Sequence, residues 1–530
     1  MAIEKPAWVQ WRPKKRTIER EWDVITIGSG LGALMAAAKL SKEGLRCLVL
    51  EQHYVAGGYA HHFPRKKKGA LYLFDVALHQ TGRLKAGQEM YEWFADVGIL
   101  DRIEVVDNEI VCRSVFPEQG LDLCIPVDAD DYRALLKERF PADAEGIDRF
   151  FEIMFAIPRE LPTLKKAGKD PSIDPFEAAP NAMRYMSGTL KDVFDDTVRD
   201  PLLRALLAQL WSYLGLPPGE VSAIYFALMW QSMHTGVHYI RGGGQALSNA
   251  LCAVIEERGG AVKLRTMVDK IVVRDGRAAG VRTANGDDFE ANYIISNAST
   301  IATYNRLLDP EHVPAGVRER INALPVSTSI IQAYVGIDGD AAALGLKEHE
   351  LFLNRTVDPD AEWKRVQAGE YEGLSCLLAN HSTANRDACP PGKSVIEAAI
   401  LADGRYWIGL PAEEYAAKKA AVTEYLLDQI AEYIPDIRDR VEVIEVGTPK
   451  TMYDYSLNPG GAVYGHSCDA QHHTVFRPEQ RTEVPGLYLA SAWTFPGAGF
   501  GGALTSGYSC ARLIVKERTH AAAAMSSAPA

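Results

Sequence analysis

Residues 23–51, "DVITIGSGLGALMAAAKLSKEGLRCLVLE", contain an unusual concentration of glycine between apolar runs. The run "DVITI" has strand character, and "GSGLGA" follows it directly. The next segment is a strong helix former that ends near Gly44, a residue suited to a C-terminal cap. A second strand-type run then ends in Glu51. Strand, glycine turn, helix, strand and acid in this order predict a dinucleotide-binding βαβ unit.

Each position of this unit has an expected task. Gly28 permits the tight turn, and Gly30 lets a pyrophosphate approach the backbone. The helix N-terminus supplies N–H donors and the positive end of the helix dipole. Glu51 is expected to accept hydrogen bonds from ribose hydroxyls, and Ala33 is an allowed substitute at the third glycine position. The predicted contacts here are Gly28, Ser29, Gly30, Leu31, Glu51 and Gln52.

Composition excludes several function classes. The chain has 530 residues, 47% of them hydrophobic, and a net charge of −12, which argues against a general nucleic-acid binder. Its eight cysteines are scattered without a C-x-x-C pair, which fits reduced thiols and neither a disulfide scaffold nor a zinc module. The histidine pairs at 61–62 and 472–473 lack partners at metal-ligand spacing, so no metal is predicted.

The sequence predicts a soluble, cytoplasmic protein. The N-terminus has no apolar signal-peptide core. Residues 484–511 carry no charge and are long enough to span a bilayer, but their prolines and glycines favour a strand, a loop and a helix start. The basic run 65–68 and the arm "WVQWRPKKR" (8–16) favour solvated segments, with contact to cofactor phosphates or to a membrane surface as alternatives. The oligomeric state stays open.

The chain divides into interleaved segments. Glycine motifs and strand patterns assign 22–83, 236–324 and 441–518 to a cofactor-binding domain, with turns at "DG" and "NGDD" predicting antiparallel strands within 270–298. Helical, Leu- and Met-rich stretches and apolar strands assign 84–235 and 325–440 to a substrate domain. Residues 1–21 are interpreted as an N-terminal arm and 519–530 as a disordered tail.

Two further motifs resemble those of flavoproteins. The glycine pair after Glu51 resembles the second diphosphate-contacting motif of glutathione-reductase-like proteins, which bind FAD. The segment "VPGLYLASAWTFPGAGFGGALTSGYSCARLI" (484–514) resembles their closing motif, in which a helix N-terminus faces the flavin. The fold class that follows is α/β, with a dinucleotide-binding domain interrupted by a mixed α+β substrate domain. The residues that this resemblance adds are Gly57, Gly58, Gly501, Gly502 and Ala503.

The resemblance extends to one family. "FDVALHQTG", "YIRGGGQALSNAL", "IISNAS", "PGGAVYG" and "TFPGAGFGGALTSG" together resemble the retinol saturase, carotenoid isomerase and phytoene desaturase family, with "LEQH" and "HHF" nearest to its retinol 13,14-reductase branch. Tyr59 and Ala60 stand where that branch has cysteines. The resemblance is strong over the cofactor-binding segments and weak over the regions that would select a substrate.

Individual residues carry over from the family. Val268 matches the residue whose backbone meets the adenine, and Asn297 ends a strand that returns to the cofactor. His79 lies on a segment that passes near the flavin ring, and Trp493 and Thr494 would sit beside it. His79 and Trp493 are the catalytic candidates; a structural, hydrogen-bonded histidine is the alternative for the former.

The function implied is FAD-dependent redox chemistry at carbon–carbon double bonds of a hydrophobic polyene or isoprenoid-like lipid, with NAD(P)H as a possible reductant. Saturation, desaturation and flavin-dependent cis–trans isomerisation all fit the motifs. A non-enzymatic prenyl-lipid carrier, such as a Rab GDP-dissociation inhibitor, is the alternative of a different class. The apolar helices of 84–235 and Phe495 would line a tunnel. Arg241 would matter only if the substrate were an amino acid, whose carboxylate needs a cationic clamp.

Overall fold

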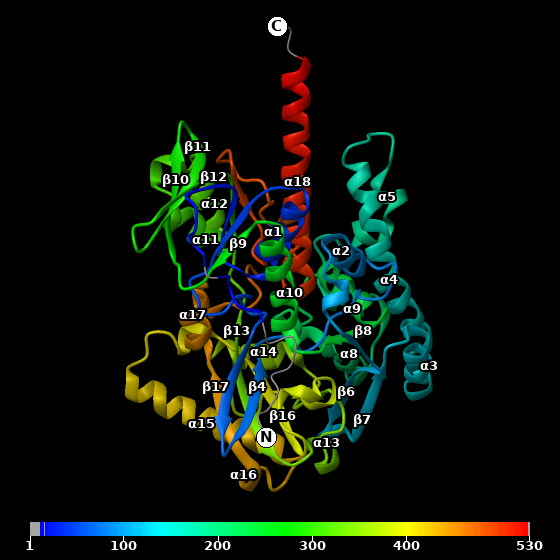
Figure 1. The fold of residues 1–530 in the computed structure, drawn as a ribbon. Helices are drawn as coiled ribbons and strands as arrows, with labels where there is room; N and C mark the ends of the chain where they lie inside the picture. The colour runs from blue at the N-terminus through cyan, green and yellow to red at the C-terminus, as the bar shows by residue number, and fades with distance from the viewer. Residues whose placement is uncertain (1–10, 15, 528–530) are drawn as a thin grey trace.

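The computed structural model describes residues 11–14 and 16–527 and contains two large sheets (Figure 1). The first sheet has the order β10-β11-β12-β1-β2-β9, and β18 pairs with β12. It combines the three segments assigned above to the cofactor-binding domain, which confirms the interleaved α/β fold. Its strands are β1 (Glu21–Ile27), β2 (Cys47–Leu50), β9 (Ala261–Lys263), β10 (Val268–Arg274), β11 (Arg277–Thr283), β12 (Asp288–Ser296) and β18 (Leu487–Leu489).

The predicted βαβ unit is present. β1 runs parallel to β2 and to β12, and α1 (Leu31–Lys42) connects the first two strands. The helix ends before Gly44, which has a φ of +82° and so takes the left-handed conformation expected after a helix C-terminus. The antiparallel pairs β10–β11 and β11–β12 confirm the predicted turns between them.

Helix α1 is covered by two later helices, α10 (Gly243–Glu257) and α18 (Gly499–Ser527). The backbones of α1 and α18 come unusually close. A Cβ on Gly507 would lie 2.1 Å from the carbonyl oxygen of Gly32, and a Cβ on Gly32 would lie 2.4 Å from that of Ala490. Gly32 therefore allows α1 to approach both α18 and the segment that follows β18.

The second sheet has the order β17-β13-β16-β15-β14-β6-β7. The boundary placed at residue 441 is wrong, because β17 pairs with β13 and belongs to this sheet. The alternating run "VEVIEVG" carries no local signal for which distant strand it joins. The strands are β6 (Ile110–Phe116), β7 (Leu121–Pro126), β13 (Ser329–Asp338), β14 (Glu350–Leu353), β15 (Cys376–Asn380), β16 (Lys393–Ala402) and β17 (Val441–Gly447).

A layer of helices from residues 84–235 packs beside this sheet around the buried Trp230 (Figure 1). Its members are α3 (Ala129–Arg139), α4 (Ala144–Ala167), α5 (Pro175–Ala178), α6 (Pro180–Arg184), α7 (Leu190–Thr197), α8 (Pro201–Leu207) and α9 (Ala223–Met233). From the same segment, α2 (Glu89–Val97) packs instead against α1 and α18. The other helices are α11 (Thr300–Ala302), α12 (Val317–Ala323), α13 (Ala341–Leu344), α14 (Pro359–Gln367), α15 (Ala412–Ala431), α16 (Ile437–Arg440) and α17 (Pro449–Ser456).

Two small antiparallel pairs of strands complete the fold, and only the second is a hairpin. β5 (Val105–Asn108) pairs with β8 (Val237–Ile240), and β3 (His62–Lys67) pairs with β4 (Ala70–Asp75). The basic run 65–68 occupies the exposed end of the β3–β4 hairpin, where Arg65 Nε lies 2.7 Å from Glu445 Oε1. It is solvated, as expected, but on a hairpin and not in a loop.

The two ends of the chain differ from the sequence interpretation. α18 continues through Ser527, so the segment 519–527 is helical where disorder was predicted; its alanine run has the highest helix propensity. In the arm, the indole of Trp11 donates a hydrogen bond to Oε2 of Glu256, a residue of α10, at 3.2 Å. Trp11 therefore lies against that helix. Residues 1–10 and 15 of the arm lie outside the described part. Across the described residues, no helix is long and apolar enough to cross a membrane.

Candidate cofactor and substrate site

A single large cavity of about 1470 Å³ reaches both sheets and the helical layer. Cavities for one small ligand usually enclose about 300–1,000 Å³. The space therefore suits a cofactor and a substrate together. One end is lined by the fingerprint glycines, the other by apolar side chains of the second sheet and the helical layer.

The dinucleotide end is organised around the Glu51 carboxylate. Glu51 Oε2 accepts hydrogen bonds from the backbone N–H of Ser29 at 2.8 Å and from its hydroxyl at 2.6 Å. Oε1 accepts one from the backbone N–H of His53 at 2.8 Å. Ser29 Oγ also accepts a hydrogen bond from Gly57 N at 3.1 Å. The carboxylate is thus held at the end of β2 with one edge on the cavity.

The N-terminus of α1 fits a diphosphate. Gly30 N donates to Asn297 Oδ1 at 2.9 Å, and no described side chain caps the helix. The first-turn amides therefore remain available to an anion. Space here is also restricted, because a Cβ on Gly30 would lie 2.4 Å from Asn297 Oδ1 and one on Gly58 would lie 3.1 Å from the Cα of Gly30. These residues fit the phosphates of the predicted cofactor.

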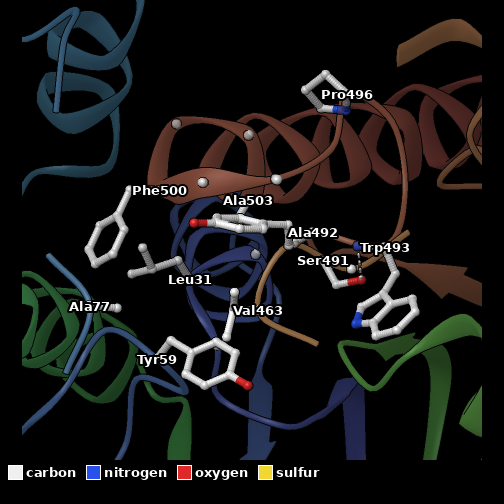
Figure 2. Close-up of a pocket in the computed structure, with 18 of the residues that line it drawn as sticks. Leu31, Tyr59, Ala77, Val463, Ser491, Ala492, Trp493, Pro496, Phe500 and Ala503 are labelled. Atoms are coloured by element: carbon white, nitrogen blue, oxygen red, sulfur yellow. Dashed lines mark hydrogen bonds between the residues drawn. The ribbon is translucent and has the colours of Figure 1, made fainter. Parts of the chain in front are cut away.

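The N-terminus of α18 forms the other cofactor wall. Figure 2 shows Leu31, Phe500 and Ala503 gathered around it, with Trp493 on the preceding loop. The Trp493 backbone N–H donates to Ser491 Oγ at 3.2 Å. The Trp493 ring packs edge-on against the ring of His466, with 4.9 Å between the ring centroids. The indole is therefore held rigidly at the cavity surface.

Most of the predicted cofactor residues line this cavity, but two do not. Thr494 is fully buried, with its hydroxyl 2.7 Å from Ser506 Oγ and donating to the Ser491 carbonyl, so it holds the loop. Ser29 is buried behind Glu51. The predicted residues that line the cavity are His79, Trp493, Gly28, Gly30, Leu31, Glu51, Gln52, Gly57, Gly58, Val268, Asn297, Gly501, Gly502 and Ala503.

The remainder of the cavity is largely apolar. Its walls come from both segments of the predicted substrate domain and include Leu214, Leu228, Met229, Met233, Ile330, Phe352, Leu377 and Ile400, with Phe495 from the loop before α18. Arg241 lies outside the cavity and pairs with Glu104, 2.7 Å from Nε to Oε2. Arg241 therefore does not provide a cationic clamp for a substrate carboxylate in this cavity.

His79 projects into the cavity wall from the segment after β4. Its Nδ1 lies 3.6 Å from Glu350 Oε1 and its Nε2 lies 3.7 Å from Glu397 Oε2. Burial lowers the pKa of His79 to about 4 and raises the pKa values of Glu350 and Glu397 to about 8 and 7. The imidazole is therefore neutral at physiological pH, and the buried carboxyl groups are at least partly protonated.

Two polar features escaped the sequence interpretation. Glu350 and Glu397 both pair with Ala379 across neighbouring strands, so their side chains share one face of the second sheet. Arg477 is buried at the cavity, where its guanidinium donates to the carbonyls of Ala492 at 2.6 Å and Ser467 at 3.1 Å. Only the strand register and the fold of the loop before α18 reveal them.

Comparison with known proteins agrees with this site. The model of the family described as flavin-containing amine oxidoreductase matches residues 34–515. The chain belongs to this family. Membership confirms the predicted flavin cofactor and an oxidoreductase, and the diphosphate cradle with Glu51 fits the dinucleotide form, FAD.

Named relatives cover nearly the whole chain. The all-trans-retinol 13,14-reductase of Danio rerio is 27% identical over 95% of this chain and 87% of its own length. The phytoene desaturase (neurosporene-forming) of Rhodobacter capsulatus is 28% identical over 92% and 93%. The chloroplastic prolycopene isomerase of Daucus carota is 24% identical over 94% and 80%. The resemblance drawn from the motifs is confirmed.

Solved structures support the fold. Putrescine oxidase bound to putrescine aligns with a TM-score of 0.63 at 16% identity, covering 94% of this chain and 99% of that one. An oxidoreductase from Methanosarcina mazei aligns with a TM-score of 0.61 at 19% identity, covering 92% and 99%. At this identity the likeness concerns the fold alone.

Proposed function

We propose that this protein is an FAD-dependent oxidoreductase that saturates or desaturates a carbon–carbon double bond of a hydrophobic polyene or isoprenoid-like lipid. The observation that carries the proposal is the continuity of one cavity from the diphosphate cradle to a long apolar wall. The relatives support the same function, since the retinol reductase and the phytoene desaturase are both named after reactions of polyenes.

The residues that line the cavity indicate which tasks fall to the cofactor and which to the protein. Bound flavin supplies hydride transfer to or from carbon. Leu228, Met229 and Ile330 offer an apolar surface that aligns a polyene and excludes water. Trp493 and His79 face the same space, and their predicted place beside the reacting bond remains part of the proposal.

A panel of acceptors tests the proposal. The purified protein is photoreduced without oxygen and then mixed with polyenes, unsaturated lipids and small polar enones, while flavin reoxidation is followed by absorbance. Rapid reoxidation by polyenes, with a product two hydrogens heavier, supports a saturase. Oxidised enzyme that removes two hydrogens from a polyene supports a desaturase. Turnover of only the polar acceptors contradicts the lipid assignment.

A flavin-dependent cis–trans isomerase is the second candidate, supported by the prolycopene isomerase relatives. It predicts a product of unchanged mass under reducing conditions. A non-enzymatic prenyl-lipid carrier predicts a protein that is purified without flavin. The reductant is tested in the same assay, because NADH or NADPH should reduce the bound flavin directly if either is the electron donor.

We also propose peripheral contact with membranes on the face formed by α4 and α5. Leu161 and Lys165 of α4 line the cavity, and Phe176 on the neighbouring α5 is 67% exposed. An aromatic side chain beside lysines suits an anionic bilayer surface. Flotation with anionic vesicles, compared between the wild type and Phe176→Glu, tests this contact.

A further inference from the structure

Behind the cavity wall, two histidines and a glutamate from distant segments converge on a small volume. His79 Nε2 lies 3.7 Å from Glu397 Oε2, and His381 Nε2 lies 3.1 Å from the same oxygen. One ligand atom from each of the three residues lies within 4.8 Å of the others. Glu397 belongs to β16, and His381 follows β15, so the second sheet presents both to His79.

These separations match those of metal ligands. Zinc binds imidazole nitrogen at about 2.0–2.1 Å, which places the ligand atoms of a tetrahedral site about 3.4 Å apart. The two measured distances, 3.1 and 3.7 Å, lie on either side of that value. Small side-chain adjustments would bring all three atoms to bonding distance of one ion.

Several ring nitrogens and carboxylate oxygens of these side chains lack hydrogen-bond partners among the described residues. His381 is 2% exposed, and among the described residues neither of its ring nitrogens finds a partner, since its approach to Glu397 lacks hydrogen-bond geometry. Glu397 is 1% exposed, and its Oε1 also has no partner within the described chain. Buried polar atoms normally have partners, because leaving them unpaired costs free energy. An ion between these side chains would satisfy them.

Neighbouring polar groups surround the three side chains as they do in metal sites. Glu350 Oε1 lies 3.6 Å from the other ring nitrogen of His79, and Glu350 in turn accepts a hydrogen bond from Gln80 at 2.8 Å and one from Tyr213. Gln332 donates to Glu397. A carboxylate that orients a ligating histidine through its second nitrogen is a recurrent feature of metal centres.

We propose that His79, His381 and Glu397 bind a divalent transition-metal ion, Zn²⁺ or Fe²⁺ in class, with an open coordination position facing the cavity. Two imidazoles and one carboxylate are a ligand set of catalytic zinc and non-haem iron sites. Burial lowers the pKa of His381 to about 4, which keeps the imidazole neutral, with one ring nitrogen able to donate its lone pair to an ion. His79 lines the cavity, so water or a hydroxyl or carbonyl oxygen of a substrate would take the open position.

This inference goes beyond the proposed redox function and replaces the expectation, drawn from the sequence, that no metal binds. His79 precedes His381 by 302 positions, and Glu397 follows His381 by 16 on another strand, so no metal-binding spacing motif marks the three residues in the sequence. It also gives His79 a role as a ligand in place of a proton donor.

Metal content is measured on the full-length, flavin-loaded protein, which makes the test independent of any substrate. The protein is treated with a chelator, desalted, titrated with Zn²⁺, Fe²⁺ or Co²⁺ and analysed by elemental mass spectrometry. About one equivalent should remain bound to the wild type, and Co²⁺ should produce visible d–d absorption. His381→Gln and Glu397→Gln should each reduce binding at least tenfold at unchanged flavin content.

The partly exposed group Asp309, Glu311 and His312 provides the control, because it is the other cluster of potential ligands in the described chain. His312→Gln should leave the stoichiometry unchanged. Retention of less than a tenth of an equivalent by the wild type, or loss of metal only in the His312 variant, overturns the proposal. If a cluster variant does not fold, the wild-type stoichiometry and Co²⁺ spectrum decide alone. A wild type that binds no metal would show that the cluster consists only of buried side chains that can be protonated.

Discussion

Replacing Glu51 with alanine is expected to loosen FAD and to lower the thermal stability of the protein. Two backbone N–H groups, of Ser29 and His53, donate to this carboxylate at 2.8 Å, and alanine leaves both without their acceptor. A buried unsatisfied donor costs about 1–3 kcal/mol. The combined loss of about 2–6 kcal/mol lies below most of the 5–15 kcal/mol typical of folded proteins, so the variant should still fold.

The effect on FAD is estimated separately. If the carboxylate accepts a ribose hydroxyl, it loses a charge-assisted hydrogen bond of about 1.5–3 kcal/mol. Since about 1.4 kcal/mol corresponds to a tenfold change in affinity, the Kd for FAD should rise by about 10- to 150-fold. Glu51→Gln keeps the shape and one acceptor oxygen and should show a smaller loss.

The measurement combines ultrafiltration at graded FAD concentrations with thermal unfolding of the same samples. Glu290→Ala is the matched control, because this residue lies on β12 in an exposed ion pair with Arg274 and should change neither quantity appreciably. If Glu51→Ala melts at a lower temperature yet binds FAD within twofold of the wild type, the carboxylate only supports the backbone and the ribose assignment is wrong.

Three further outcomes are expected. Gly32→Ala should destabilise the protein by about 1–3 kcal/mol in chemical denaturation, because the added Cβ meets the Ala490 carbonyl oxygen at 2.4 Å, whereas Gly168→Ala, whose nearest new contacts are at 3.8 Å, should be nearly neutral. In chelator-treated protein, the contribution of Glu350 to stability should fall between pH 6.5 and 8, since the folded state keeps the proton of Glu350 up to a pKa of about 8 while the unfolded carboxyl is already ionised. The buried histidines beside it have lowered pKa values and gain protons near pH 6.5 only on unfolding, which opposes this slope; the difference in melting temperature between the wild type and Glu350→Gln isolates the Glu350 contribution, and a difference that does not change with pH contradicts the burial argument. Ile330→Trp, which fills the apolar part of the cavity, should reduce kcat/KM for a polyene by about tenfold or more at unchanged flavin content, and an unaffected rate would place the substrate elsewhere.

The cofactor half of the molecule was largely predictable from the sequence. Its signals are local: glycines at a turn, a helix start and an acid at a strand end all lie within the segment 23–58. Such patterns reflect short-range backbone requirements, and so Gly30, Glu51 and Gly57 come together at the cavity. Thr494 does not line the cavity although its neighbour Trp493 does, because sequence adjacency cannot tell which side chain of a loop turns inward.

The second sheet and its polar cluster were not predictable in the same way. Whether Glu350 and Glu397 share a face depends on the register of three strands through Ala379, which is a long-range property. Likewise, the sequence of β17 alternates as expected for a strand, but it contains no local signal that identifies β13 as its neighbour in the sheet. The chemistry of His79 is therefore visible only after the sheet has been assembled around it.

The construction of the cofactor site from both ends of the chain bears on how the protein matures. The α1 amides and Glu51 emerge from the ribosome early, whereas β18 and the N-terminus of α18 emerge after most of the chain has been made. β18 joins the sheet beside β12, and α18 then closes on α1 through Gly32 and Gly507. Contacts between such distant segments form slowly. Stable flavin capture should consequently be a late event in biosynthesis, and a chain interrupted before residue 499 should lack the wall needed to retain the cofactor.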